Sequence, residues 1–251
     1  MRLGGWDRKY GEILRDFSFS RKADADAARL LNSLLPTKTP LLGLQRKIKG
    51  RTVFVIGAGP SLSRSIGKIR RYKGTTKIVA DGATRALIER GILPDIVVTD
   101  LDGNIGSLRK ASKMGAIMVV HSHGDNTGLL PAALLFRNCI GTTEGRPFGK
   151  IRNFGGFTDG DRCVFLARYF GAKNIVMFGM DFGGKVGRYS KEGRYDRRIK
   201  VAKLARARLL LEWLASRDGA GLYTTSVPLK GFEKIRYRDL ELLADKGKGR
   251  K

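Results

Sequence analysis

The stretch that decides the fold is residues 79–103, VADGATRALIERGILPDIVVTDLDG. Two short runs of mainly apolar, β-branched residues, Lys77–Ala80 and Ile96–Thr99, are typical of buried strands in a parallel sheet. Each run is followed directly by an aspartate, and the intervening pattern predicts a short helix over about 84–90. Strand, helix and strand in this order predict two parallel strands of an α/β fold.

Three carboxylates follow these strands. Asp81 ends the first strand, and Asp100 and Asp102 end the second, where an extended backbone would point both to one side. Ligands of open α/β sheets bind outside the carboxyl ends of the strands. Crowded carboxylates repel one another, and a divalent cation such as Mg²⁺ carrying phosphates relieves that repulsion. Taken singly, Asp81 could cap a helix and Asp102 could form a turn with Gly103; together the three favour a metal site.

The composition describes a globular protein. The chain has 251 residues, 42% hydrophobic and 29% charged, enough for one large domain with a small appendage. No apolar run approaches the roughly 20 residues that span a bilayer, and the first residues lack the apolar core of a secretory signal. Two cysteines, Cys139 and Cys163, are too few for a metal cluster or a disulfide framework. We therefore expect a cytoplasmic protein without a membrane partner.

The charge is strongly positive. Lysine and arginine number 49 against 23 acidic residues, a formal net charge of +26, with the basic residues densest at 185–208 and 246–251. Such a surface attracts polyanions, so a nucleic-acid-binding protein is one alternative. The sequence has no RNA-binding aromatic motif and no helix-turn-helix pattern. Phosphate-rich small substrates, or a cytoplasm rich in salt or polyanions, would explain the charge equally well, so nucleic acid is not required.

The N-terminal fifty residues read as a helical cap. Apolar residues recur at helical spacing over about 7–17 and 20–35, and Pro36 ends the second helix. A linker is expected from Pro36 to about Gly50. The predicted organisation is a cap over 1–50, a main domain over 51–245 and a disordered basic tail over 246–251. Nothing in the cap suggests a catalytic role.

The main domain opens with a strand, Val53–Ile56, followed by the glycine turn GAGPSL at 57–62 and a helix to about Tyr72. A glycine turn into a helix N-terminus offers free N–H groups that suit phosphate. The motif departs from the dinucleotide-binding fingerprint and from the P-loop. Phosphate binding and plain turn geometry therefore both remain open for the residues concerned, Gly57, Gly59 and Ser61.

A second polar motif, HSHGDN at 121–126, follows a predicted strand at 116–120 and precedes a predicted helix at about 128–136. His121, His123 and Asp125 could bind zinc, but no further nitrogen or sulfur ligand is evident. A more favoured interpretation makes Asp125 a fourth acid at a strand end, with His123 or Asn126 contacting phosphate. A capped turn is the alternative.

A third motif, GFTDGDR at 156–162, begins a predicted helix that runs to about Phe170 and leads into a strand at 174–178. Thr158 or Asp159 would cap this helix. Three acids, Asp159, Asp161 and Asp181, could reach the same edge of the sheet as the first carboxylates, although capping alone would explain Asp159.

The remaining pattern completes the architecture. A glycine- and lysine-rich loop at 183–195 precedes a basic helix over about 196–216, whose arginines are mostly solvated although one or two near the loop could contact phosphate. A strand at 222–226 and a helix at 237–244 follow. The repeated strand–helix order predicts a Rossmann-like three-layer α/β/α fold with a mostly parallel sheet, plus the small helical N-terminal segment.

The motifs resemble a known family. GAGPSL at 57–62, ADGA at 80–83, GILPDIVVTDLDG at 91–103, HSHGDN at 121–126, GFTDGDR at 156–162 and GMDF at 179–182 are similar, in this order, to the archaeal 6-hydroxymethyl-7,8-dihydropterin pyrophosphokinases, the MptE-like family. The central stretch also resembles thiamine pyrophosphokinases, whose segment reads ADGG…PD…GDFDS. Thr99 and Gly103 depart from that pattern, which argues against thiamine as the substrate.

The resemblance implies Mg²⁺-dependent transfer of pyrophosphate from ATP to the hydroxymethyl group of a reduced pterin, releasing AMP, in folate or tetrahydromethanopterin biosynthesis. It makes Asp81, Asp100, Asp102 and Asp125 magnesium ligands, the last by its match to the thiamine enzymes. We expect Asp100, Asp102 and Asp125 to act in catalysis.

The other expected contacts divide between the two substrates. Those to ATP come from Gly57, Gly59, Ser61, Asp81, Gly82, His123 and Asn126, and those to the pterin from Thr158, Asp159, Asp161 and Asp181. The sequence leaves open whether the protein forms a homo-oligomer. The alternatives are thiamine pyrophosphokinase, a related sugar-nucleotide transferase and the nucleic-acid-binding protein.

Overall fold

The sheet is central to the structure, a computed structural model that describes residues 4–37, 39–190, 196–217 and 221–244. Within these residues nine strands form one all-parallel sheet in the order β6-β5-β4-β3-β2-β1-β7-β8-β9. The strands are β1 (Thr52–Ile56), β2 (Thr76–Ala80), β3 (Ile96–Thr99), β4 (Ile117–His121), β5 (Cys139–Thr142), β6 (Ile151–Arg152), β7 (Asn174–Phe178), β8 (Gly221–Thr224) and β9 (Glu233–Lys234).

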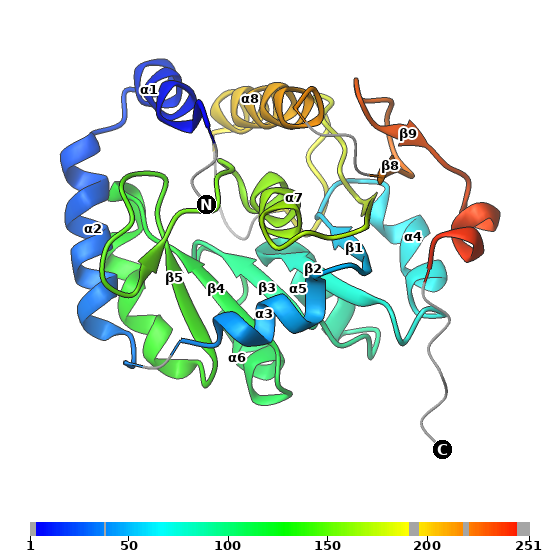
Figure 1. Cartoon of the computed structure of the whole chain (residues 1–251), viewed down its shortest axis with the longest axis horizontal. Helices are drawn as coiled ribbons and strands as arrows, with labels where there is room; N and C mark the ends of the chain where they lie inside the picture. Colours follow the sequence, from blue (N-terminus) through cyan, green and yellow to red (C-terminus); the bar gives the residue numbers. More distant parts are fainter. Residues whose placement is uncertain (1–3, 38, 191–195, 218–220, 245–251) are drawn as a thin grey trace.

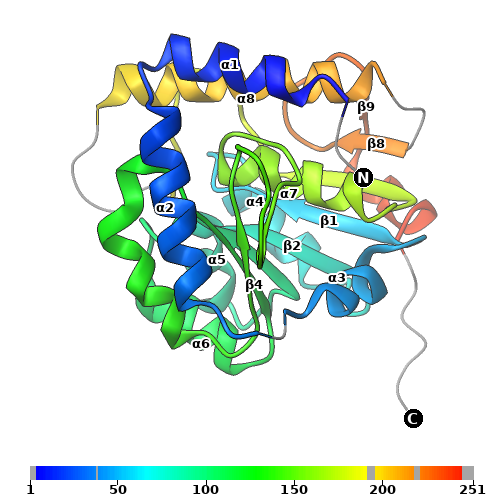
Figure 2. The ribbon, with the colours of Figure 1, turned by 60° about the vertical axis from the view of Figure 1, so that its left-hand side comes forward.

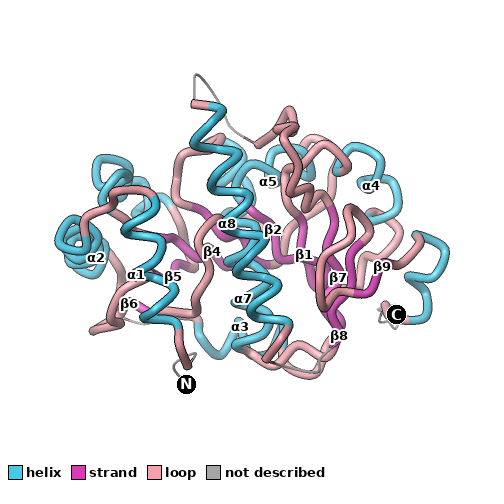
Figure 3. The backbone as a smooth tube through the Cα atoms, turned by 90° about the horizontal axis from the view of Figure 1, so that it is seen from above, coloured by secondary structure: helices cyan, strands magenta, loops and turns pink. Residues whose placement is uncertain are grey.

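Helices cover both faces of this sheet (Figures 1 and 3). One face packs against α1 (Trp6–Asp16), α3 (Leu41–Ile48), α7 (Asp159–Tyr169) and α8 (Arg197–Ala215). The other packs against α2 (Arg21–Leu34), α4 (Leu62–Ile69), α5 (Asp81–Ile88), α6 (Ile105–Lys113) and the 3-10 helices η1 (Gly124–Leu135) and η2 (Tyr237–Leu242). Strand side chains alternate between the layers, with Val53 and Val55 in the first and Phe54 and Ile56 in the second. The three-layer prediction is confirmed.

The topology fixes where a site can form. From β1 the chain moves outward, strand by strand, to β6, and then returns to place β7 on the other side of β1. The direction of winding reverses there, so the loops that follow β1 and β7 lie side by side at the carboxyl edge of the sheet. Such switch points are where open α/β sheets bind ligands. The loops after β2, β3, β4 and β5 open on the same edge.

The N-terminal helices are part of the core. Trp6, Tyr10 and Ile13 of α1 are buried in the same cluster as residues of α7 and α8, and α2 packs on η1. Figure 2 shows α1 lying along α8, with α2 descending beside the sheet. The helical segment expected from the sequence therefore shares its core with the main domain.

Several sequence-based boundaries were wrong. The expected linker over 36–50 contains α3, because Leu44 and Ile48 bury one face of a helix. α5 begins at Asp81, three residues earlier than predicted, and the helix expected at 128–136 is the 3-10 helix η1, with Pro131 inside it. β9, only two residues long, was missed. The tail over 246–251 lies outside the described residues, among which no helix has the length and apolar character to cross a membrane.

The burial of α1 makes a stability prediction. Ile13 is 1% exposed, whereas Ile105, the first residue of α6, is 39% exposed. We expect Ile13→Ala to lower the free energy of unfolding by about 2–5 kcal/mol, because it leaves a cavity in the shared core, and Ile105→Ala to lower it by less than about 1 kcal/mol. Urea denaturation measures both. Equal, small effects would mean that α1 is not part of the cooperative fold.

Candidate active site

Three carboxylates converge at the carboxyl ends of β2 and β3. Asp81 is the first residue of α5, and Asp100 and Asp102 follow β3 directly. One oxygen from each carboxylate lies within 4.8 Å of the others. The structure therefore brings together three of the four predicted metal ligands.

The backbone around Leu101 produces this convergence in an unexpected way. The extended segment predicted between Asp100 and Asp102 is wrong, because Leu101 adopts a left-handed conformation with φ +72°. Its N–H donates to Thr99 Oγ1 at 2.8 Å, and the Thr99 hydroxyl in turn donates to Asp81 Oδ2. A Cβ added at Gly103 would collide with the Asp81 carboxylate, so the chain needs glycine at that position.

The electrostatics of the cluster fit a cation. Burial and the neighbouring charge of Asp100 raise the pKa of Asp81 to about 7. Burial also acts to raise the pKa of Asp100, but His123 and Arg162 beside it hold that pKa well below its usual range. Asp81 Oδ1 and Asp100 Oδ1 are buried and accept no hydrogen bond from the described residues. Buried acceptors left without donors, in an oxygen-only set, fit a hard divalent cation such as Mg²⁺.

A cavity of about 430 Å³ opens beside these acids. Its wall combines the three carboxylates with basic side chains, two phenylalanines and a second group of buried charges. The lining residues used below are Phe19, Asp81, Gly82, Arg85, Asp100, Asp102, His123, Glu144, Phe157, Thr158, Asp159, Arg162, Arg188, Lys200 and Lys203. The predicted residues Asp81, Gly82, Asp100, Asp102, His123, Thr158 and Asp159 thus share one cavity.

The HSHGDN motif divides between this cavity and the interior. His123 lines the cavity, with Nε2 3.7 Å from Asp100 Oδ2, and its Nδ1 accepts the Asp125 N–H, so the neutral ring carries its proton on Nε2. Asn126 is buried and donates to the carbonyls of Asp100 and His121 at 2.8 Å each. The Asp125 side chain is 63% exposed and lies outside both the cluster and the cavity lining. The structure therefore does not place Asp125 or Asn126 as the sequence suggested.

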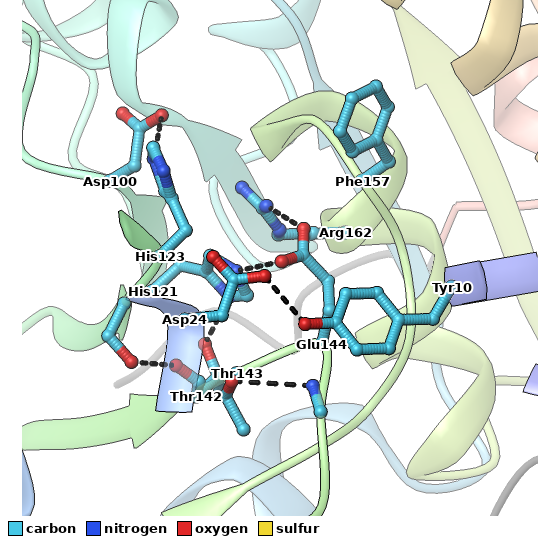
Figure 4. Close-up of polar contacts among 12 residues, drawn as sticks. Tyr10, Asp24, Asp100, His121, His123, Thr142, Thr143, Glu144, Phe157 and Arg162 are labelled. Atoms are coloured by element: carbon cyan, nitrogen blue, oxygen red, sulfur yellow. Dashed lines mark hydrogen bonds and ion pairs between the residues drawn. The ribbon is translucent and has the colours of Figure 1, made fainter. Parts of the chain in front are cut away.

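His121 does not share a zinc site with His123. It is buried, with Nδ1 3.0 Å from Thr142 Oγ1 and Nε2 3.1 Å from Glu144 Oε2. Burial and the charge of Arg162 lower its pKa to about 4. Figure 4 shows the His121 ring beside Glu144, whereas His123 is the histidine that reaches Asp100.

The GFTDGDR acids have different roles. Asp161 is fully buried and accepts hydrogen bonds from Phe157 N, Thr158 N and Thr158 Oγ1 at 2.6–2.8 Å, closing a capping box on α7. It does not line the cavity. Asp159 does, and burial together with the charge of Asp100 raises its pKa well above the usual range.

The glycine turn is filled by a carboxylate of the protein itself. Asp181 Oδ2 accepts both Ser61 N–H and Ser61 Oγ–H at 2.8 Å. A Cβ at Gly59 would collide with that carboxylate, and one at Gly57 would lie 2.5 Å from Met180 Sδ. The turn is therefore packed against the loop after β7, beside a smaller cavity of about 80 Å³.

Sequence reasoning missed a buried group of charges next to the acids (Figure 4). Glu144 Oε1 lies 2.5 Å from Arg162 Nη2, and Arg162 Nη1 lies 3.3 Å from Asp159 Oδ1. His121 and Arg162 lower the pKa of Glu144 to about 2, against the effect of burial. The only signal that the sequence offers for Glu144 is an acidic residue shortly after β5, in TTEGR at 142–146.

The cluster makes a metal-binding prediction. Asp100→Asn removes a buried ligand oxygen and should weaken Mg²⁺ binding by about 10–100-fold. Asp125→Asn is the matched control and should change the affinity by less than about twofold, since Asp125 lies outside the cluster. Calorimetric titration of each purified variant with Mg²⁺ measures both. A large loss in Asp125→Asn would restore Asp125 as a ligand.

Metal binding should also release protons. With the pKa of Asp81 near 7 before binding, about half of the protein molecules carry a protonated Asp81 at pH 7, and a cation must displace that proton. Release should fall toward zero at pH 9, while below about pH 6 the Mg²⁺ affinity should drop about tenfold per pH unit. Titrations in buffers of different ionisation enthalpy count the protons. Heats independent of the buffer between pH 6 and 8 would contradict this assignment.

Comparison with solved structures supports the fold. A glycosyltransferase, MAf from Magnetospirillum magneticum AMB-1, superposes with a TM-score of 0.55 at 15% identity, covering 82% of this chain and 40% of that one. At this identity the likeness concerns the architecture alone.

Comparison with known sequences identifies the family. The chain is 43% identical over 233 residues to the 6-hydroxymethyl-7,8-dihydropterin pyrophosphokinase of Pyrococcus furiosus, covering 90% of this chain and all of that one. It is 45% identical over 222 residues to the Methanothermobacter thermautotrophicus protein of the same name, covering 85% and 95%. Residues 29–187 match the family described as 6-hydroxymethylpterin diphosphokinase MptE-like. The chain therefore belongs to the MptE-like 6-hydroxymethylpterin diphosphokinase family.

Proposed function

We propose that this protein transfers the pyrophosphoryl group of ATP to the hydroxymethyl group of 6-hydroxymethyl-7,8-dihydropterin, releasing AMP. The observation that carries the proposal is the cluster of three carboxylates, with two buried oxygens lacking donors, in a cavity otherwise rich in basic side chains. The names of the relatives support the same reaction. Its product would supply folate or tetrahydromethanopterin biosynthesis in the cytoplasm.

The acids would hold Mg²⁺, which when bound neutralises charge on the phosphate oxygens. Asp81, Asp100 and Asp102 fit this role by their donor set and their crowding. Gly103 and Thr99 keep the Asp81 carboxylate in place, so the ligand oxygens are fixed before any substrate binds. Catalysis of phosphoryl transfer depends mainly on such positioning and on charge stabilisation.

Basic side chains in the cavity would bind the triphosphate. Arg85, Arg188 and Lys200 line the same cavity as the acids, and the Nε2–H of His123 is a further donor. These groups favour a transition state in which negative charge spreads over the phosphate oxygens. Because Asp181 already holds the N–H and hydroxyl groups of Ser61, the triphosphate would contact the basic side chains rather than the glycine turn.

The transfer itself needs one proton acceptor. The hydroxymethyl oxygen forms a bond to the β-phosphorus, the bond from that phosphorus to the bridging oxygen breaks, and AMP leaves with the electron pair. Asp159 lines the cavity, whereas the Asp125 side chain is exposed and lies outside it, so we assign Asp159 to accept the hydroxyl proton.

An assay with ATP, Mg²⁺ and 6-hydroxymethyl-7,8-dihydropterin that separates AMP from ADP tests this function. We expect AMP formation that depends on the pterin, and a loss of at least about 100-fold in kcat/KM in Asp100→Asn. Asp125→Asn is the control and should keep most of the activity.

Other products would contradict the proposal in different ways. ADP would indicate a simple kinase. AMP formed only with thiamine would identify the thiamine enzyme. No turnover, together with steeply salt-dependent binding to RNA or DNA, would favour the nucleic-acid-binding alternative.

A further inference from the structure

The cavity is lined by two chemically different groups of residues. We call Phe19, Phe157 and Glu144 the aromatic end, and Arg85, Arg188 and Lys200 the basic end. None of the residues of the aromatic end lines the smaller cavity beside the glycine turn. Lys200, by contrast, lines both cavities. The basic side chains account for phosphate binding, so the aromatic end requires a separate explanation.

Two phenylalanine rings line the aromatic end. The centroids of Phe19 and Phe157 are 6.4 Å apart, and the centroid of Phe17, which does not line the cavity, is 4.9 Å from that of Phe157. Lys203 Nζ lies 5.1 Å from the Phe19 centroid and 5.9 Å from that of Phe157. Lys203 also lines the cavity, so the lysine and both rings border the same space. Aromatic rings that line a cavity suit stacking with a flat heteroaromatic ring.

Glu144 provides a fixed acceptor at the same end. Its side chain is 6% exposed, with Oε1 2.5 Å from Arg162 Nη2 and Oε2 3.1 Å from His121 Nε2. The pKa of Glu144, lowered to about 2 beside these groups, leaves the carboxylate ionised. Each oxygen has a second lone pair and Glu144 lines the cavity, so the carboxylate keeps acceptor capacity for the N–H donors of a ligand.

We propose that Phe19, Phe157 and Glu144 form the subsite for the pterin ring. This inference depends on the proposed function and deepens it. The amino-oxopyrimidine edge of a pterin carries two adjacent N–H donors, which match the two acceptors of a carboxylate. The corresponding edge of adenine pairs one donor with one acceptor and lacks this match. The ring at the aromatic end is therefore the pterin, which leaves ATP to the basic end.

The N-terminal helices hold both components of this subsite. Trp6 Nε1 donates to the Glu144 carbonyl at 2.8 Å. Phe19 lies in the turn between α1 and α2, where Ser18 is left-handed with φ +54° and Phe19 N–H donates to the Leu14 carbonyl at 2.9 Å. The stretch matched by the family begins at residue 29, so it does not include Phe19. The cap predicted to lack a catalytic role thus completes the substrate site.

Phe19→Leu tests the proposal, with Phe17→Leu as the matched control, since Phe17 packs in the same aromatic cluster without lining the cavity. We expect Phe19→Leu to raise the KM for 6-hydroxymethyl-7,8-dihydropterin about tenfold, because a stacking surface is lost, with the KM for ATP changed less than about twofold. Phe17→Leu should change neither KM by more than about twofold. Thermal unfolding of both variants identifies any general loss of structure.

A direct binding measurement separates the remaining outcomes. Quenching of 6-hydroxymethylpterin fluorescence should report weaker binding to Phe19→Leu and to Glu144→Gln, while calorimetric ATP affinity stays unchanged. A raised KM for ATP in Phe19→Leu would assign the aromatic end to adenine and overturn the proposal. An unchanged pterin KM would overturn it as well, provided that the wild type forms AMP; if the wild type forms none, the proposed function itself fails.

Discussion

The repulsion among three carboxylates is the constraint on which the site depends. Asp81, Asp100 and Asp102 hold their oxygens within 4.8 Å of one another, an arrangement that costs free energy in a folded protein unless a cation or a proton compensates. Local structure maintains it through the left-handed Leu101 and the close approach of Gly103. Strain and like charges persist at functional sites because the surrounding fold over-determines them.

The second group of charges shows how the fold limits this cost. Arg162 places positive charge beside Asp100, and it also joins Glu144 to Asp159. Buried ions of alternating sign compensate one another only when their geometry is held closely. The N-terminal helices contribute here too, since Asp24 accepts both the Tyr10 hydroxyl and the Gly124 N–H beside His123. Hydrogen bonds of the N-terminal helices thus help to position the residues that line the site.

The strand assignments and the metal cluster could be predicted because their signals are local. A run of β-branched residues ending in an aspartate specifies a buried strand and the position of a carboxylate at its end, and parallel strands bring those ends to one edge. This reasoning located Asp81, Asp100 and Asp102, together with His123 and Asp159, in what proved to be one cavity. It failed for Asp125, because the chain turns into η1 before that side chain can reach the cluster.

The sequence by itself determined the three-layer class, the strands and the acids at their ends, since each follows from periodicity and from the residue that ends a run. Only the tertiary structure decided what those residues contact. It made Asp161 a helix cap, paired Asp181 with Ser61 across 120 positions, and brought Trp6 to the Glu144 carbonyl across 138. Packing decides which residues become partners, because most buried polar groups in a folded protein are hydrogen-bonded to whichever groups the fold brings beside them.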